Sequence, residues 1–325
     1  MKAARLTEHP QFWPAAVLLL LLAINGVLNP SFFALTWREG HLYGALVDIL
    51  NRAAPLMAVA LGMTVVIATR GIDISVGAIV AIAGTVAAML VGTHGVLVAF
   101  GAAMAAALVC GLWNGLLVAT LGLQPIIATL ILMVAGRGLA QLLTDGQILT
   151  IYEPQSFFWL GGGYLLGLPV SVFVLATVAG LTGLLMRRTA LGLFIESVGI
   201  NPVASRLAGV PTLAVMLFVY LYSSFGAGLA GLMITSNIKS ADANNAGLLL
   251  ELDAILAVTL GGGLLSGGRF SLVGSLIGAL VIQTLTSTIY ALGVPPQVTM
   301  VVKALVVFAV CILQSPVWVK KGGAR

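Results

Sequence analysis

The sequence predicts an all-α membrane protein, a polytopic bundle of about ten transmembrane helices with both termini in the cytoplasm. Three observations lead to this fold class. Of the 325 residues, 60% are apolar and only 8% are charged. The apolar residues gather into ten runs, and the basic residues fall mainly in alternate connections between those runs. We therefore expect one transmembrane domain over residues 1–325, with no separate soluble domain.

The ten expected spans follow from length, because a helix needs roughly 20 apolar residues to cross a hydrocarbon layer about 30 Å thick. The eighth run is too short to cross as a regular helix, and a Gly-rich stretch follows it, so we expect a short or broken helix there. The runs are Trp13–Leu28, Ala53–Ala68, Ser75–Val91, Val96–Thr120, Pro125–Leu143, Leu168–Met186, Thr212–Thr235, Ala254–Gly263, Ser271–Leu292 and Val298–Leu313.

The distribution of positive charge sets the expected orientation. With the N-terminus placed inside, ten basic residues fall on one side of the membrane and three on the other. Basic residues gather in cytoplasmic loops of membrane proteins, so this bias predicts cytoplasmic termini. The inner set is Lys2, Arg5, Arg70, Arg187, Arg188, Arg206, Arg269, Lys320, Lys321 and Arg325, and the outer set is Arg38, Arg52 and Lys239.

The composition argues against several classes of function. Cys110 and Cys311 both lie in apolar runs, and they form neither a disulfide framework nor a metal-binding spacing. His9, His41 and His94 lie at span edges or outside, so we expect no metal site, no cofactor and no catalytic site. Topology explains the net charge of +5, which therefore gives no reason to expect nucleic-acid binding.

Three connections stand out along the chain. Residues 144–167 and 236–253 are expected on the outer side, and the first of these is rich in aromatic residues typical of a membrane interface. Residues 187–211 are expected on the inner side.

Internal similarity gives conflicting indications. Leu121–Pro125 resembles Leu292–Pro296, and the expected orientations of these two corners are opposite, as an inverted repeat requires. Ala58–Gly62 also resembles Ala257–Gly261, but in the same expected orientation. An inverted repeat is therefore a hypothesis that the sequence leaves open.

The inner connection contains a short helix with all its end signals. Asn201 can cap the first turn, because its side chain accepts a bond from a free backbone N–H. Pro202 suits the first helical position, where no N–H is needed. Gly209 can adopt the left-handed conformation that ends a helix, and Pro211 prevents continuation. The helix is either a plain connector or a lever that presses on a cytoplasmic partner.

Four separated segments resemble the sugar permeases of ATP-driven (ABC) importers of the ribose/galactose type. They are Gly71–Gly77 (GIDISVG), Ala128–Gly138, Ala190–Val210 and Glu251–Val258. The resemblance extends over about residues 45–315 and is strongest to galactofuranose permease subunits. It implies a permease of the bacterial inner membrane that imports a monosaccharide and does no covalent chemistry of its own.

The resemblance also implies partners. A double-cassette ATPase would dock on the cytoplasmic side, a periplasmic sugar-binding protein on the outer side, and a second permease subunit, identical or different, within the bilayer. Contact with the ATPase would involve the inner connection, at Glu196, Gly199, Asn201, Ala204, Arg206 and Gly209. Contact with the binding protein would involve the outer connection, at Asn244, Asn245, Glu251 and Asp253.

Polar residues within spans are candidates for the sugar pathway, because intramembrane charge is expensive and a sugar needs hydrogen-bond partners. Helix–helix hydrogen bonding explains each of them at least as well, and Asp73 could instead cap a helix near a span edge. Lys303 is expected to snorkel to the outer interface. The pathway candidates are Asp73, Trp113, Asn114, Gln124, Arg137, Gln141 and Gln283.

Two other functional hypotheses remain. A branched-chain amino acid or nucleoside ABC permease would have a related architecture. An ion-coupled secondary transporter would need ionisable groups near the midplane. We expect no acidic residue deep in a span, with Asp73 at an edge, which disfavours ion coupling.

Overall fold

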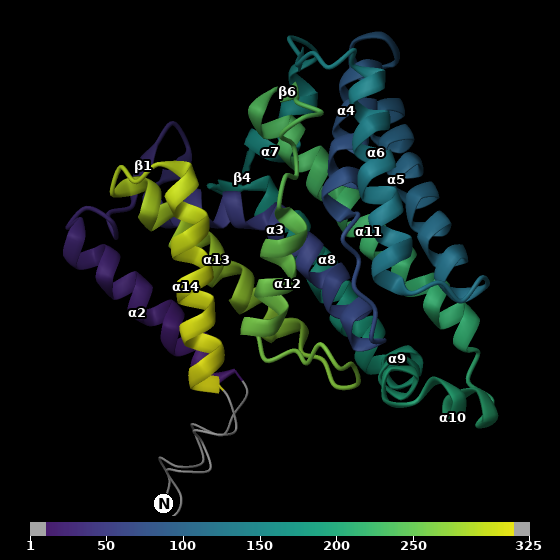
Figure 1. The fold of residues 1–325 in the computed structure, drawn as a ribbon. Helices are drawn as coiled ribbons and strands as arrows, with labels where there is room; N and C mark the ends of the chain where they lie inside the picture. Colours follow the sequence, from purple (N-terminus) through teal and green to yellow (C-terminus); the bar gives the residue numbers. More distant parts are fainter. Residues whose placement is uncertain (1–10, 315–325) are drawn as a thin grey trace, which may run out of the picture.

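A computed structural model describes residues 11–314, which form a bundle of long helices with short hairpins near one end (Figure 1). Within this range, seven helices are long and apolar enough to cross a membrane. The expected polytopic helical bundle is confirmed at this level. The seven are α3 (Ala45–Ala68), α4 (Val76–His94), α5 (Val96–Ala119), α6 (Pro125–Leu143), α8 (Val170–Arg188), α11 (Thr212–Ile238) and α13 (Leu272–Ala291).

Three further helices coincide with the remaining expected runs, namely α2 (Phe12–Leu28), α12 (Leu250–Leu260) and α14 (Pro296–Gln314). The eighth run was expected to form a short helix, and α12 has only 11 residues. Short elements complete the order: β1 (Thr36–Arg38), β2 (His41–Tyr43), β3 (Leu149–Thr150), η1 (Gln155–Phe158), α7 (Trp159–Gly162), β4 (Tyr164–Leu165), β5 (Leu168–Pro169), α9 (Leu191–Ile200), α10 (Pro202–Leu207) and β6 (Ser240–Ala241).

The strands form three small antiparallel pairs. β1 pairs with β2, β4 pairs with β5, and β3 pairs with the distant β6. The β3–β6 pair places Leu149 opposite Ala241, so it joins the connection after α6 to the connection after α11. The two connections that were expected outside therefore lie together.

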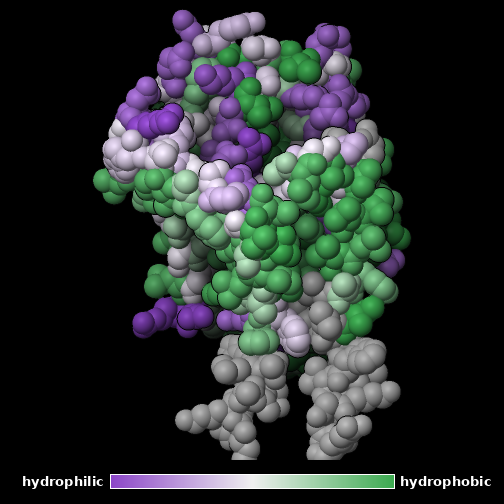
Figure 2. All heavy atoms as spheres, turned by 90° about the vertical axis from the view of Figure 1, so that its left-hand side faces the viewer, coloured by the Kyte–Doolittle hydropathy of each residue, from purple (hydrophilic) through white to green (hydrophobic). Residues whose placement is uncertain are grey.

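The surface has the polarity pattern of a membrane protein. Figure 2 shows a hydrophobic belt across the described part of the face, with a broad polar cap above it and a smaller polar patch below. Exposed apolar side chains such as Leu97, Val134 and Leu184 belong to the long helices. A belt of this kind matches the hydrocarbon layer, where apolar side chains meet lipid.

Two long helices form the centre of the bundle. α3 packs against α8, α11, α12 and α13, while α11 also packs against α4 and α5. Side chains such as Leu61 and Met63 of α3 and Tyr220 of α11 have no exposed surface. Residues 53–68 of α3 are covered on most sides, and their sequence is apolar all round apart from Thr64.

Each central helix is followed by a non-helical segment and then by a helix that starts inside the bundle. Residues 69–75 connect α3 to α4, and residues 239–249 connect α11 to α12 apart from the short strand β6. In Figure 1, the connection after α3 runs back up along the bundle before α4 begins. We call residues 69–75 the first re-entrant segment and residues 242–249 the second.

The two halves of the chain share this order of elements. In the first half, α3 is followed by a re-entrant segment, α4, α5, a corner and α6. In the second, α11 is followed by a re-entrant segment, α12, α13, a corner and α14. The corner before α6 lies at the lower end in Figure 1, and the corner before α14 lies at the upper end.

Close backbone contact joins α12 to α13 at Gly278, where a Cβ atom would overlap the carbonyl oxygen of Ala257. We expect Gly278→Val to lower the free energy of unfolding by about 3 kcal/mol, because a rigid backbone group cannot move aside as a side chain can. The midpoint of thermal unfolding in detergent measures this effect.

Gly101→Ala is the matched control, since Gly101 lies on α5 and a Cβ there has no neighbour within 4 Å. It should raise stability by up to about 1 kcal/mol through helix propensity. Equal unfolding midpoints for the two variants would contradict the close packing of α12 on α13.

Candidate transport site and coupling segment

Asp73 lies deep in the bundle, in the first re-entrant segment. Its side chain is fully buried, and its Oδ2 accepts a hydrogen bond from Ser223 Oγ at 2.8 Å. Ser223 lies about 17 Å along α11 from the start of that helix, at 1.5 Å per residue. The expectation that Asp73 lies at a span edge was wrong, because residues 69–75 turn back into the helical layer.

Asp73 also organises the start of α4. Its Oδ1 accepts hydrogen bonds from the backbone N–H of Ser75 at 3.1 Å and from Ser75 Oγ at 2.6 Å. Asn114 Nδ2 on α5 donates to Ser75 Oγ at 2.8 Å. The structure therefore brings Asp73 and Asn114 together through Ser75.

The second re-entrant segment is held by α6. Arg137 donates through one guanidinium nitrogen to the carbonyl oxygens of Ala243 at 3.1 Å and Ala246 at 2.6 Å. Gln141, one turn further along α6, donates to Asn244 Oδ1 at 2.8 Å. The sequence leaves Arg137 either to bond within the protein or to face the pathway, and its bonds to the two carbonyl oxygens link α6 to the second re-entrant segment.

Asp242 shapes the turn at the outer end of the same segment. Its Oδ1 accepts from the backbone N–H groups of Asn244 and Asn245, and its Oδ2 accepts from Asn245 Nδ2 at 2.7 Å. The side-chain bond from Asn245 holds the pKa of Asp242 below its ordinary value. A carboxylate that is ionised there also favours the nearby positive charge of Arg137.

The helices α4 and α12 begin against each other. Glu251, in the first turn of α12, is 9% exposed, and a Cβ atom at Gly77 would overlap its Oε2. Gly77 in turn lies near the start of α4. A residue with any side chain at position 77 would separate the two helix starts.

Asp253 pairs with a residue of α14. Its Oδ2 accepts from Lys303 Nζ at 2.8 Å, and both side chains are mostly buried. The expectation that Lys303 snorkels to the interface is replaced by this ion pair. Together with the contact between Glu251 and Gly77, the pair places both acids within the helical layer rather than on an exposed outer loop.

The other pathway candidates do not join this cluster. Trp113 is half exposed on α5, Gln124 is exposed at the start of α6, and Gln283 is partly buried on α13. In the part of the chain that the structure describes, their side chains make no hydrogen bond. The sequence could not separate these residues from Asn114, because helices that are apolar all round do not show which side faces the protein.

The inner connection folds as its end signals predict. α10 begins at Pro202, and the Asn201 side chain accepts from the N–H groups of Val203 at 3.1 Å and Ala204 at 3.0 Å. Gly209 has a φ of 85°, in the left-handed region. The side chains of Ala204 and Arg206 are exposed, so this helix presents a free surface to a partner.

The helix before it, α9, is tied to the central helix α3. Arg70 donates to the carbonyl oxygen of Ile200 at 2.6 Å, at the C-terminal end of α9. A Cβ at Gly199 would overlap the carbonyl oxygen of Ala68, the last residue of α3. Gly268 N–H donates to that same oxygen at 2.8 Å. The end of α9, the end of α3 and the loop before α13 therefore form one junction.

Sequence reasoning missed two residues of this junction. The sequence places Arg70 only among the inner basic residues, whereas its guanidinium bonds to the end of α9 across the fold. Gly268 belongs to the Gly-rich stretch after the eighth run, a pattern that does not indicate contact with α3. The available signal was a positive residue able to satisfy a free carbonyl at a helix C-terminus, but the pattern does not indicate which helix it would contact. Glu196, also on α9, is partly buried and lines a cavity described below.

Two helices, α4 and the short α12, start inside a bundle of apolar helices after interrupted backbone, and interrupted helices of this kind are found at binding sites of membrane transporters. The fold thus defines a multi-pass membrane transport protein. The chain belongs to the family described as the permease component of branched-chain amino acid transport systems, which matches residues 45–311. It is a permease subunit of an ABC importer and not an enzyme.

Several curated proteins are similar over nearly the whole chain. The galactofuranose transporter permease protein YtfT of Escherichia coli is 50% identical over 93% of this chain and 90% of its own length. The fructose import permease protein FruF of Bifidobacterium longum is 40% identical, over 94% and 87%. The ribose import permease protein RbsC of Escherichia coli is 36% identical, over 92% and 91%. No solved structure shows significant similarity.

The hydrogen bonds of Asp73 give a prediction for stability. Asp73→Ala should lower the free energy of unfolding substantially, because the Ser75 N–H and two serine hydroxyls lose a buried acceptor, at about 1–3 kcal/mol for an unsatisfied group. Asp73→Asn keeps one acceptor oxygen and should cost less. Thermal unfolding in detergent ranks the variants, and an alanine variant as stable as the wild type would show that this cluster does not hold α4.

Proposed function

We propose that this chain is the membrane-spanning subunit of an ATP-driven importer of a monosaccharide, with a galactofuranose-like sugar as the substrate. The observation that carries the proposal is 50% identity to a galactofuranose permease over 93% of the chain. Fructose and ribose permeases are also similar over more than nine-tenths of it. Branched-chain amino acids appear in the family description, and they are the second candidate substrate class, ahead of nucleosides.

In this proposal the chain crosses the bacterial inner membrane ten times as one domain, residues 1–325, with both termini in the cytoplasm. Seven helices meet the criteria for spans, and α2, α12 and α14 would complete the set. The charge bias supports the orientation, although the terminal residues 1–10 and 315–325 that contribute to it lie outside the described range. The shared order of elements in the two halves supports an inverted repeat.

A second permease subunit would cover the re-entrant segments. Non-helical backbone at membrane depth is tolerated only where protein buries it or where it lines a water-filled cavity. Asn244, Asn245 and Leu248 of the second segment are exposed in the single chain. A pathway between two subunits, passing these segments, satisfies that requirement. Whether the second subunit is a copy of this chain or a different permease is part of the test.

The pathway residues we propose are Asp73, Asn114, Arg137 and Gln141, and the support is that their hydrogen bonds join them to the two re-entrant segments. The exposed Trp113, Gln124 and the partly buried Gln283 stay proposals with less structural support. The binding protein would dock on the outer connections 144–167 and 236–253, where Asn244 and Asn245 are exposed. Glu251 and Asp253 are mostly buried, which does not favour their contact with it.

The cytoplasmic ATPase would contact the inner connection, residues 187–211, through α10 and its two ends. Ala204, Arg206 and Gly209 belong to the exposed α10 and its end, and Asn201 fixes the start of that helix. Glu196 and Gly199 belong to α9, which contacts the end of α3. Movement of α10 would therefore be passed through α9 to the end of α3, which is followed directly by the first re-entrant segment.

ATP binding in the partner would draw the two inner connections together and change which side the pathway faces. The motor can shift that equilibrium only by its different affinity for the two states. Hence the surface of α10 has to be complementary to the ATPase in one state more than in the other.

Charge reversal on α10 tests the proposal. In proteoliposomes holding the chain with its permease partner, ATPase and binding protein, Ala204→Asp with Arg206→Asp should lower ATP-driven sugar uptake about tenfold or more, since 1.4 kcal/mol of lost docking energy is tenfold. Arg38→Asp, on the exposed outer hairpin, is the control and should leave uptake unchanged. Uptake that persists in the double variant would reject α10 as the coupling surface.

The same vesicles decide the substrate class and the energy source. Excess unlabelled leucine or nucleoside should not reduce uptake of labelled sugar. Uptake should require ATP on the side of the membrane to which α10 is exposed. Competition by leucine would favour the amino acid reading, and uptake driven by a proton or sodium gradient without ATP would favour a secondary transporter.

Arg70 should transmit coupling rather than bind the ATPase. Arg70→Gln removes the charge that satisfies the Ile200 carbonyl at the end of α9. We expect lower sugar uptake per ATP hydrolysed, with ATPase binding unchanged, and partial recovery in Arg70→Lys because a cation is restored. The ratio of uptake to phosphate release measures this. An unchanged ratio in Arg70→Gln would show that the α9–α3 junction does not depend on this bond.

A further inference from the structure

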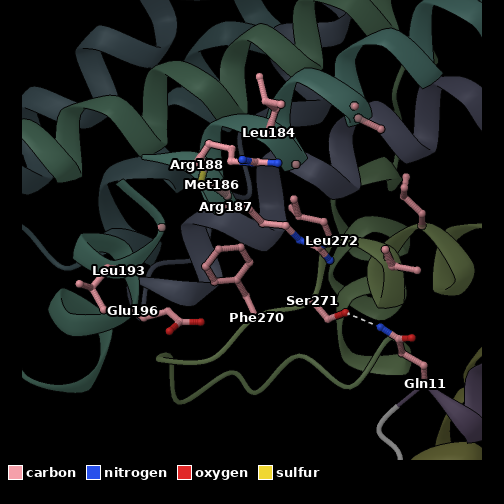
Figure 3. Close-up of a pocket in the computed structure, with 16 residues that line it drawn as sticks. Gln11, Leu184, Met186, Arg187, Arg188, Leu193, Glu196, Phe270, Ser271 and Leu272 are labelled. Carbon is pink, nitrogen blue, oxygen red and sulfur yellow. Dashed lines mark hydrogen bonds between the residues drawn. The ribbon is translucent and has the colours of Figure 1, made fainter. Parts of the chain in front are cut away.

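A large cavity lies beside the last turns of α8, between that helix, α9 and the start of α13. Its volume is about 730 Å³. Figure 3 shows the side chains of Arg187, Glu196 and Phe270 around this space, with Leu184 and Leu272 at its margins. None of these residues belongs to the cluster around Asp73. The cavity is therefore separate from the proposed transport site.

One end of the cavity is positively charged. Arg187 and Arg188 close α8, and both side chains are exposed. Within residues 11–314, neither guanidinium has a carboxylate within 4 Å, and Glu196 on the opposite wall forms no ion pair. Two arginines against one glutamate leave a net positive charge. Arginine binds phosphate through two parallel N–H bonds, which makes this end suited to a phosphate group.

The polar end continues along the start of α13. Ser271 precedes this helix and accepts from Gly274 N–H at 3.0 Å, while Gln11 Nε2 donates to Ser271 Oγ at 3.2 Å (Figure 3). These amide and hydroxyl groups offer further hydrogen-bond partners beside the arginines. They suit the glycerol and headgroup hydroxyls of a lipid as well as its phosphate.

The remaining walls of the cavity are apolar and open. Gly180 and Gly183 of α8 have no atom within 4 Å of the position that a Cβ would take. Leu184 faces the same space, and Leu272 and Leu276 of α13 form the opposite wall. These residues lie on two membrane helices, so the groove extends from the charged end into the hydrophobic belt.

We propose that this groove binds an anionic phospholipid of the inner leaflet, with the phosphate on Arg187 and Arg188 and an acyl chain along Gly180 and Gly183. The combination of a basic end and an apolar groove between membrane helices is the chemistry that recognises anionic lipid headgroups. The ten residues before Gln11 carry Lys2 and Arg5 against Glu8, and this net positive charge disfavours them as the occupant of a basic site. The orientation of the leaflet rests on the topology proposed above, but binding itself does not.

Lipid retention by the full-length chain tests the proposal. Purified protein in detergent is mixed with phosphatidylglycerol or phosphatidylcholine, and bound lipid is counted by native mass spectrometry. The wild type should retain phosphatidylglycerol about tenfold better, a ratio that corresponds to 1.4 kcal/mol. Arg187→Gln with Arg188→Gln should abolish this preference. Arg206→Gln is the control, because it removes the same charge from the exposed α10 and should keep the preference.

A second variant tests the acyl groove separately. Gly183→Leu fills the open space and favours the helix, so it should fold while losing both lipids, although both arginines remain. Excess soluble glycerol phosphate should not displace bound phosphatidylglycerol. A preference that survives loss of both arginines, retention in Gly183→Leu, or displacement by glycerol phosphate would each overturn the proposal.

Discussion

The structure depends on satisfying backbone groups where the two re-entrant segments interrupt the helices. Hydrocarbon offers no hydrogen bonds, so each free N–H or C=O must find a partner within the protein. α6 supplies partners for both segments. Thr129 accepts from the Ile74 N–H at 3.3 Å in the first segment, and Arg137 donates to two carbonyls in the second. A single helix thereby contacts both interruptions.

The buried acid at the first interruption follows from the same constraint. Asp73 accepts three hydrogen bonds from two serines, which replace the water that it would otherwise need. An apolar residue there would leave the start of α4 without its partners. The stretch Gly71–Ser75 therefore has a structural role, because it holds the start of α4. Its position beside Asn114 also makes it a candidate for contact with a polar substrate.

The arrangement also explains how a cytoplasmic surface can influence the interior of the membrane. The end of α9 contacts the last residue of α3, directly before the first re-entrant segment. Gly268, from the loop before α13, meets the same point. Packed elements that share one junction move together rather than independently, because tightly packed contacts tolerate little deformation.

By itself, the sequence determined the membrane class, the positions of the helices, the short α12 and the capped α10, since hydrophobic length, charge bias and end signals are local properties. It also indicated the family and the candidate site residues. It could not predict that Asp73 lies deep in the bundle, that Lys303 pairs with Asp253, or that Arg70 bonds to α9. Those contacts join residues 50 or more positions apart. Only the tertiary structure decided them, because in helices that are apolar all round the pattern does not show which face meets which neighbour.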